Sequence, residues 1–417
     1  MKPSGKDVDP QDRAFGQRVQ RFRKERGRTQ AELAAALGKT SSWLSQVERG
    51  VQPVQRMDLL QQIADELGVS VQQLRPSVPG DGPSQAPTAQ SLSNDLDETR
   101  RLLSGHPALH TLLTDQDDSG TTRTLEPLRS DVDDLWDLTH AGQLAQVSAL
   151  AVQLLPELER AVRTDGEHQA ELHLLLSRSY QALSAAFVRQ DEADAAWVAA
   201  DRAVFAAERS GDPLHVCASV FRMVQAFVRL RCLGQAEHAA QTAISALGKQ
   251  GRHSPEALSV LGSLHLALAL VRARSSARTE AKEEIAKARA IAAQLGENRN
   301  DFNLEFGPVN VEIQAVSTAV DLGDAGEALD IGLTIDAGEL SPERQGRLLM
   351  DLGRAHAQRR HGGEALRCLL RAEAVAPEII QTHQAARAAI RELVLVAEPN
   401  ASRDLLELAE RAGALED

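Results

Sequence analysis

The sequence predicts an all-α protein made of two helical domains. Ala and Leu dominate, whereas aromatic residues make up only 3% of the chain, and this composition is typical of closely packed helices. Apolar residues recur at helical spacing from about residue 92 to 416, and no segment shows the alternation of a strand. The chain has 417 residues, 42% of them hydrophobic, which is enough for two or three domains with sizeable cores.

Charge is distributed unevenly along the chain. Residues 1–75 carry 13 Lys and Arg against 9 Asp and Glu, a net charge of +4. The remaining residues carry 33 against 50, a net charge of −17. A small basic segment therefore precedes a large acidic one, and only the basic segment suits a polyanionic partner.

A segment rich in Pro, Gly and Ser marks the domain boundary. Residues 76–91, "PSVPGDGPSQAPTAQS", cannot bury a core and are interpreted as a flexible linker. We expect a flexible N-terminal arm at 1–13, a first domain at 14–75 and a helical domain at 92–417.

The first domain is expected to contain five helices. Thr29 and Glu32 have the spacing of a capping box, and Gly38 and Gly50 suit helix ends. Thr40 or Ser41 is expected to cap the third helix. The five helices are expected at 14–26, 30–37, 42–49, 57–67 and 71–74.

The third helix presents two different faces. Leu44 and Val47 are three residues apart and are expected to face inward, whereas the polar residues of the helix lie toward the other side: Ser41, Ser42, Ser45 and Gln46. Small polar side chains at the start of an exposed helix can reach base edges in the major groove of DNA. The N–H groups of the same helix end suit a phosphate.

The stretch "RKERGRTQAELAAALGKTSSWLSQVERG" resembles the helix-turn-helix of the Cro/C1-type, or Xre, regulators. The resemblance covers residues 14–75 and implies binding to double-stranded DNA. It implies a structural pair between Arg23 and Glu48. The residues expected at the DNA are Gln30, Lys39, Thr40, Ser41, Ser42, Trp43, Ser45 and Gln46.

Several of these residues have an alternative structural role. Ser41 could serve only as a cap, and Trp43 could pack against a neighbouring helix. Arg18, Arg21 and Arg28 are open between phosphate contact and simple solvation. Because one such domain touches few base pairs, we expect a homodimer on an inverted-repeat operator.

The helical domain contains internal repeats. Residues 345–377 resemble a tetratricopeptide repeat, and weaker copies precede it. Small residues expected at successive helix contacts are Ala196, Ala236, Ala281, Ala328 and Ala365. We also expect a helix pair at 131–163 with Trp136 in its core, and a short helix at 92–104. The repeats predict an α-solenoid with a concave face formed by the first helix of each pair.

Polar residues on those first helices are candidates for a peptide, small-molecule or protein ligand. An amide can bind a peptide backbone and Arg can hold a carboxylate. The alternative is that they are surface residues or bond neighbouring repeats. The candidates are Arg222, Gln225, Arg229, His265, Asn310 and Gln314. The segment 298–314 interrupts the repeats and is expected either to fold against the groove or to fill a repeat junction with Phe302 and Phe306.

The sequence shows no constellation for catalysis, and we expect no enzyme activity, no metal and no cofactor. His106 and His110 have the spacing of some zinc ligands, but Pro107 and the lack of a third ligand argue against a site. No signal peptide or membrane span is expected. The three cysteines are expected to be reduced core thiols of a cytoplasmic protein.

These features favour a sequence-specific transcriptional regulator whose helical domain dimerises or senses a ligand. The arrangement is similar to that of regulators from Streptomyces-type bacteria. The alternative is an interaction scaffold, in which the repeats recruit a protein and the helix-turn-helix only tethers it to DNA.

Overall fold

The computed structural model describes residues 10–37, 39–52, 54, 62–64, 66–67, 69, 74, 96–105, 124–250, 254–338, 340–397 and 400–415. Over these residues the regular elements are helices, and a single antiparallel bridge is the only strand-like pairing. The all-α fold class is confirmed. The chain divides into two compact units, Met1–Ser91 and Leu92–Glu416, which we call the N-terminal unit and the helical array. The expected linker, His106, His110 and most of the expected fourth and fifth helices lie outside the described residues.

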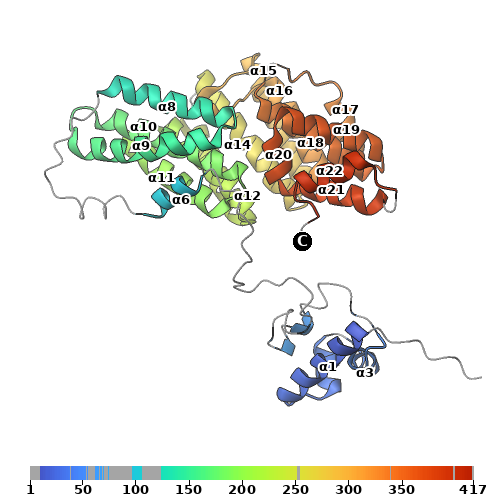
Figure 1. The fold of residues 1–417 in the computed structure, drawn as a ribbon. Coiled ribbons are helices and arrows are strands. Elements are labelled where there is room, and N and C mark those ends of the chain that lie inside the picture. The colour runs from blue at the N-terminus through green and yellow to red at the C-terminus, as the bar shows by residue number, and fades with distance from the viewer. Residues whose placement is uncertain are drawn as a thin grey trace, which may run out of the picture. The chain divides into compact units, whose positions relative to one another are not determined.

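The N-terminal unit begins with three described helices, α1 (Pro10–Glu25), α2 (Gln30–Ala36) and α3 (Ser41–Glu48) (Figure 1). Helix α1 starts four residues before the expected position, so 10–13 belong to it and not to an arm. Pro suits the first helical position because its fixed φ matches the helix and its missing N–H has no partner there anyway.

The expected capping box at the start of α2 is present. The Thr29 hydroxyl accepts a hydrogen bond from the N–H of Glu32 at 3.2 Å, and the N–H of Thr29 donates to Glu32 Oε2 at 2.8 Å. Two N–H groups that the helix cannot satisfy itself are thereby paired. This defines where the second helix begins.

Helix α1 packs very closely against the C-terminal end of α3. A Cβ placed on Gly16 would lie 2.3 Å from the Val47 carbonyl oxygen, so no side chain fits there. Phe15, Leu44 and Val47 are fully buried around this contact. The sequence analysis did not identify the role of Gly16, although it helps to fix the orientation of α3.

The helical array consists of α6 (Asp97–Ser104) followed by consecutive helix pairs (Figure 1). The six pairs of its described residues are α8 (Leu125–His140) with α9 (Leu144–Thr164), α10 (Gln169–Arg189) with α11 (Ala193–Ser210), α12 (Pro213–Arg229) with α13 (Leu233–Gln250), α14 (Pro255–Arg274) with α15 (Arg278–Leu295), α16 (Pro308–Asp321) with α17 (Ala325–Gly332), and α18 (Pro342–Gln358) with α19 (Gly362–Val375). Helices α20 (Pro377–Thr382), α21 (Gln384–Ala397) and α22 (Arg403–Arg411) complete it.

The same small residue recurs inside each repeat that the sequence analysis identified. Each of the five expected alanines is the fourth residue of the second helix of its pair, and each is completely buried: Ala196, Ala236, Ala281, Ala328 and Ala365. A larger side chain at this point would separate the two helices. The expected positions of the repeat contacts are confirmed.

A left-handed residue joins the two helices of every pair. These residues are Gly142, Asp191, Arg231, Ser276, Gly323 and Arg360, with φ between 60° and 80°. The N–H of the following residue returns to a carbonyl five residues earlier, as Glu192 does to Phe187 at 3.0 Å. This hydrogen bond belongs to the Schellman motif, which ends a helix abruptly and reverses the chain. One turn geometry is therefore repeated along the array although its residue type varies.

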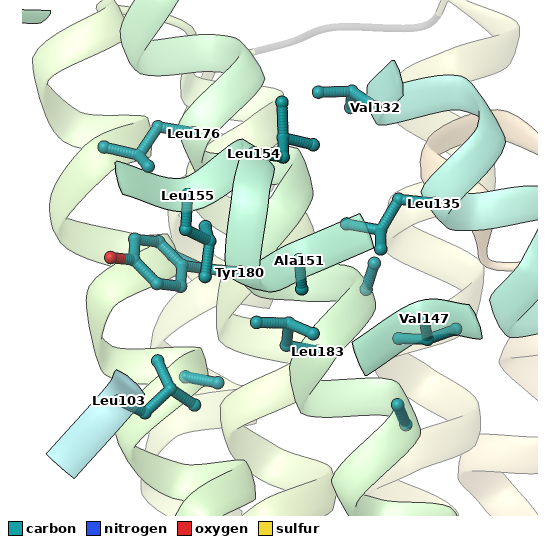
Figure 2. Close-up of a cluster of buried hydrophobic side chains, with 14 of the residues drawn as sticks. Leu103, Val132, Leu135, Val147, Ala151, Leu154, Leu155, Leu176, Tyr180 and Leu183 are labelled. Atoms are coloured by element: carbon teal, nitrogen blue, oxygen red, sulfur yellow. The ribbon is translucent and has the colours of Figure 1, made fainter. Parts of the chain in front are cut away.

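Helix α6 packs against the first pairs of the array. Leu103 of α6 joins a buried cluster with leucines and valines of α8, α9 and α10 (Figure 2). Arg100 of α6 forms ion pairs with Glu192 and Asp194 at the start of α11. Trp136 is buried in the same cluster. The expected short helix and the expected first helix pair are confirmed.

Helix α14 is apolar because it lies in the core of the array. It is the one helix in the described part of the chain that is long and apolar enough to cross a membrane, with a mean hydropathy of 1.4. Most of that segment, 72%, is buried inside the array. Cys217 is likewise buried, but Cys232 and Cys368 are only half-buried, which differs from the expectation of three core thiols.

The array closes on itself. Helix α20 packs against α10, although 193 residues separate the residues that meet. The Thr382 hydroxyl donates to the Arg189 carbonyl, and Gln384 Nε2 donates to Asp191 Oδ2 at 2.9 Å. The inner face of the solenoid is therefore a space bounded by helices on both sides.

Candidate functional site

Helix α3 exposes a polar face. Ser41 and Ser42 are exposed, and Ser45 and Gln46 are half-buried, while Leu44, Val47 and Glu48 are buried on the opposite side. Thr40 caps the helix, since its hydroxyl accepts from the Trp43 N–H at 3.2 Å. The helix thus begins at Ser41 and ends at Glu48, one residue earlier at each end than expected. The small side chains of its first turn are available to a ligand.

A buried ion pair ties the three helices together. Arg23 of α1 forms two hydrogen bonds with Glu48 of α3, at 2.6 and 3.0 Å. Gln30 of α2 donates to Glu48 Oε2 at 2.7 Å. Burial alone would raise the pKa of Glu48, but the hydrogen bonds from Arg23 and Gln30 outweigh it and lower the pKa. The expected pair of Arg23 and Glu48 is present, and it holds Gln30 as well.

Other predicted DNA residues also have structural contacts. Trp43 is half-buried and packs against the core of the N-terminal unit, and the Lys39 ammonium lies 5.9 Å from the centre of its ring. Arg18 Nε donates to the Leu74 carbonyl at 2.9 Å. Arg28 pairs with Glu66 at 2.6 Å. These contacts position the side chains at the surface, and their role at DNA stays a prediction.

The inner face of the array contains a cavity of about 130 Å³. Its wall consists of first helices of the pairs, namely α8, α10, α12, α14, α16 and α18, together with α20 and residues 303–305. Five of the six residues proposed for a groove lie in this wall: Arg222, Gln225, Arg229, Asn310 and Gln314. Tertiary packing therefore gathers side chains from helices about 90 residues apart in the sequence.

His265 is not in that wall. It is buried on another side of α14, where its Nδ1 is bonded to Glu284 of α15. Glu284 also accepts from Arg272 at 3.0 Å and from Lys287 at 2.8 Å. Burial raises the pKa of Glu284, but His265 and Lys287 lower it to about 2. His265 therefore belongs to a network that joins the two helices of one pair, because helical spacing turns it away from the inner face.

The wall of the cavity carries more positive than negative groups. Six arginines line it, Arg189, Arg222, Arg229, Arg274, Arg344 and Arg347, against the three carboxylates of Glu305, Glu343 and Glu378. Burial raises the pKa of Glu343, but Arg344 and Arg347 lower it strongly. Burial raises the pKa of Glu378. The cavity is therefore electropositive.

The sequence analysis missed most of these charged residues. Arg344 and Arg347 lie three residues apart on the first helix of the best tetratricopeptide-like repeat, so the spacing that singled out Arg222 and Gln225 could have found them. No such signal exists for the residues of α20. His383 lines the cavity because the chain returns to α10.

Arg222 has no carboxylate partner. Arg222 is 5% exposed, and its guanidinium donates to the Asn303 carbonyl at 2.7 Å and to Gln225 Oε1 at 3.2 Å. No ion pair to Arg222 occurs within the described residues. The Cζ atom of Arg222 lies 5.1 Å from the centre of the Trp136 ring. Burial and the nearby Arg344 lower its pKa to about 9, so it remains charged at pH 7.

Unsatisfied polar atoms gather in the same wall. Six buried side-chain atoms of the described residues have no hydrogen-bond partner, and four of them belong to cavity residues. The four are Trp136 Nε1, Arg222 Nε, Ser263 Oγ and Asn310 Oδ1. Buried polar groups are normally paired, so their concentration at one place indicates a space meant for another molecule or for water.

The segment between α15 and α16 has both of the roles that the sequence left open. Phe306 is fully buried against Gly262, where an added Cβ would lie 2.0 Å from the ring. Phe302 is half-buried with its ring edge-on to His215. Asn303 and Glu305 line the cavity, and both have positive φ, as does Phe302. Such backbone strain is kept where a loop must hold specific groups in place.

Comparisons with known proteins concern mainly the N-terminal unit. Residues 14–76 match the family described as a helix-turn-helix domain. Over 60 residues the chain is 39% identical to the HTH-type transcriptional regulators SinR of Bacillus subtilis (strain 168) and of Bacillus licheniformis. This match covers 14% of the chain and 54% of each relative, so the chain spans about half the length of the curated relatives it matches.

The chain also aligns with a solved structure at low similarity. The crystal structure of Bacillus thuringiensis PlcR in complex with the peptide PapR7 and DNA aligns over 87% of this chain and 99% of that one. The TM-score is 0.34 and the sequence identity is 13%, a level that does not establish a common fold. The match of residues 14–76 identifies this part of the N-terminal unit as a helix-turn-helix domain, which in this chain is joined to a helical array.

Proposed function

We propose that this helix-turn-helix protein is a sequence-specific DNA-binding transcriptional regulator whose helical array responds to a ligand. The match of residues 14–76 to helix-turn-helix domains supports DNA binding, as does the similarity to the two SinR regulators. The observation that carries the proposal is the polar face of α3. Its exposed first turn combines two serines with helix N–H groups and no acidic side chain.

In this proposal α3 enters the major groove of double-stranded DNA. Ser41, Ser42, Ser45 and Gln46 face the bases, and Gln30 meets the DNA at the start of α2. Lys39 and Thr40 lie near the phosphates. Serines read bases weakly, so DNA shape contributes to the sequence preference. Such a protein acts in the cytoplasm, at the bacterial nucleoid.

The protein acts as a homodimer in this proposal. One α3 presents too few side chains to select a site in a genome, and two copies on an inverted repeat multiply the selectivity. Large exposed apolar side chains in α21, in α22 and just after α22 support self-association: Leu395, Val396, Leu406 and Leu415. Exposed apolar side chains are typical of interaction surfaces where they form a contiguous patch.

Ligand binding in the array is coupled to DNA binding through the arrangement of the two copies. A ligand can shift that arrangement only if it binds one conformation more tightly than the other. If a molecule stabilises the array but leaves the affinity for the operator unchanged, this coupling is wrong.

The test is selection of genomic fragments by the purified full-length protein at physiological salt. Enrichment of one inverted-repeat sequence is expected, with loss of enrichment in the variant Ser42→Ala, Gln46→Ala. Gln17→Ala is the matched control, because Gln17 is an exposed amide on α1 and not on α3. Binding that is weak, independent of sequence and steeply dependent on salt would refute specific regulation and favour the scaffold.

A further inference from the structure

The cavity of the helical array has a chemistry that defines its ligand more closely. We propose that it binds a compact apolar carboxylic acid, with the carboxylate at Arg222 and the rest of the ligand against the apolar side chains of the cavity wall. This inference rests on the proposed ligand-responsive function, but it concerns the array alone.

Arg222 carries a buried charge that no carboxylate of the described residues pairs with. Removing a guanidinium from water is costly unless an anion and hydrogen bonds compensate for it. Four other arginines of the wall pair with carboxylates: Arg229 with Asp191 at 3.5 Å, Arg274 with Asp321 at 3.2 Å, Arg344 with Glu305 at 3.1 Å, and Arg347 with Glu343 at 3.2 Å. Arg189, which is only half-buried, donates to the Thr139 carbonyl. Arg222 has only a carbonyl and an amide, and its Nε has no acceptor. A carboxylate would supply the missing charge and acceptor.

The remaining unsatisfied atoms supply further polar contacts. Trp136 Nε1 is a donor and Ser263 Oγ can donate or accept, so both can bond a carboxylate, whereas Asn310 Oδ1 is an acceptor. These residues come from α8, α14 and α16, and Arg222 comes from α12. Four helices of the closed array therefore converge on one small volume with polar groups that the protein itself leaves unpaired.

The size and the apolar wall limit the rest of the ligand. The cavity of about 130 Å³ is close to the roughly 150 Å³ of an apolar cavity that holds benzene. Trp136, Phe221, Leu266 and Leu304 supply apolar surface. One ring or branched chain with a carboxylate fits this space. That chemistry exists both in free small acids and in the last residue of a peptide.

The test measures thermal unfolding of the full-length protein without DNA. The probes are phenylacetate and 4-methylpentanoate, each beside its neutral primary amide, and the peptide Ala-Ala-Phe beside its amidated form. We expect the acids to raise the melting temperature at concentrations up to about 10 mM and the amides to have little effect. Stabilisation by free acids identifies a small-molecule ligand, and stabilisation only by the free-ended peptide identifies a peptide terminus.

Arg222→Met is the decisive variant, since it keeps most of the side-chain volume and removes the charge. We expect the affinity for the acid to fall about tenfold to a hundredfold, as for a lost charge-assisted hydrogen bond. The unliganded variant should melt no lower than the wild type, which a merely structural Arg222 would not allow. Arg222→Lys should retain part of the response, and Arg367→Met, which changes an exposed arginine of α19, should retain all of it.

Two results would overturn the proposal. One is equal stabilisation by acids and amides, and the other is no stabilisation by any carboxylate probe. The outcome is independent of the DNA selection, because a protein that selects no operator can still show the carboxylate response, and a specific regulator can lack it.

Discussion

The buried pair of Arg23 and Glu48 leads to a quantitative prediction about the N-terminal unit. Arg23 is 7% exposed and Glu48 is 4% exposed. Replacing Arg23 by Met leaves the Glu48 carboxylate buried with only the amides of Gln20 and Gln30 as donors. Breaking a buried pair on one side costs about 3–5 kcal/mol. A unit of about 60 residues has only about 3–9 kcal/mol of stability, so we expect this change to bring it close to unfolding.

Hydrogen exchange of α1 to α3 in the full-length protein measures this effect locally. A loss of about 3–5 kcal/mol lowers the protection of these amides by about two to three and a half orders of magnitude. Affinity for the operator should be lost in parallel, because Glu48 ends α3 and holds Gln30. Exchange in the helical array should not change.

Two further variants separate the buried charge from other effects. Arg28→Met removes the exposed pair with Glu66, whose side chains are 40% and 36% exposed, and should cost at most about 1 kcal/mol. Arg23→Met combined with Glu48→Leu removes both buried charges and should restore much of the protection. If Arg23→Met costs no more than Arg28→Met, the reasoning from burial is refuted.

Two predictions concern acid and packing. Because the pKa of Glu48 is lowered in the folded state, ionised Glu48 stabilises the N-terminal unit above the ordinary glutamate pKa near 4.5, and this stabilisation is lost as the pH falls through the lowered pKa. Hydrogen exchange from pH 6 to pH 3 should therefore show a smaller acid-induced loss of amide protection in Glu48→Gln than in the wild type. An unchanged loss would contradict this reasoning. Gly262→Ala places a Cβ 2.0 Å from the Phe306 ring and should cost about 1–3 kcal/mol in thermal unfolding. The control is Gly248→Ala, where the added Cβ would have no atom within 4 Å, and this change should be neutral or slightly stabilising. Equal effects of the two substitutions on the melting temperature would refute the close contact at Gly262.

Local patterns allowed helix α3 to be predicted in detail. Thr29 with Glu32 and Thr40 with Trp43 N–H are contacts within one turn, so their geometry is encoded in neighbouring residues. The approach of α1 to α3 at Gly16 was not predictable in this way. It depends on two backbones meeting across about 30 residues of sequence, and the sequence marks it only as one glycine in a helix.

The repeats were predictable to a similar extent. The buried alanines recur because every helix pair must meet at the same small position, and that requirement leaves a trace in each repeat. The irregular spacing of the repeats hid the charged residues that share one wall. Arg222 and Gln225 were found from their spacing on one helix, whereas His265 was proposed only because it lies on a first helix, and it does not face the cavity.

The sequence by itself determined the helical class, helix α3 with its polar face, and the contacts within each helix pair, because these depend on residues only a few positions apart. Only the tertiary structure decided that the array closes from α10 to α20 and surrounds a cavity. It alone showed that Arg222 is buried there without a carboxylate. Closure and burial depend on the summed rotations of many stacked helices, and no short segment of the chain carries that information.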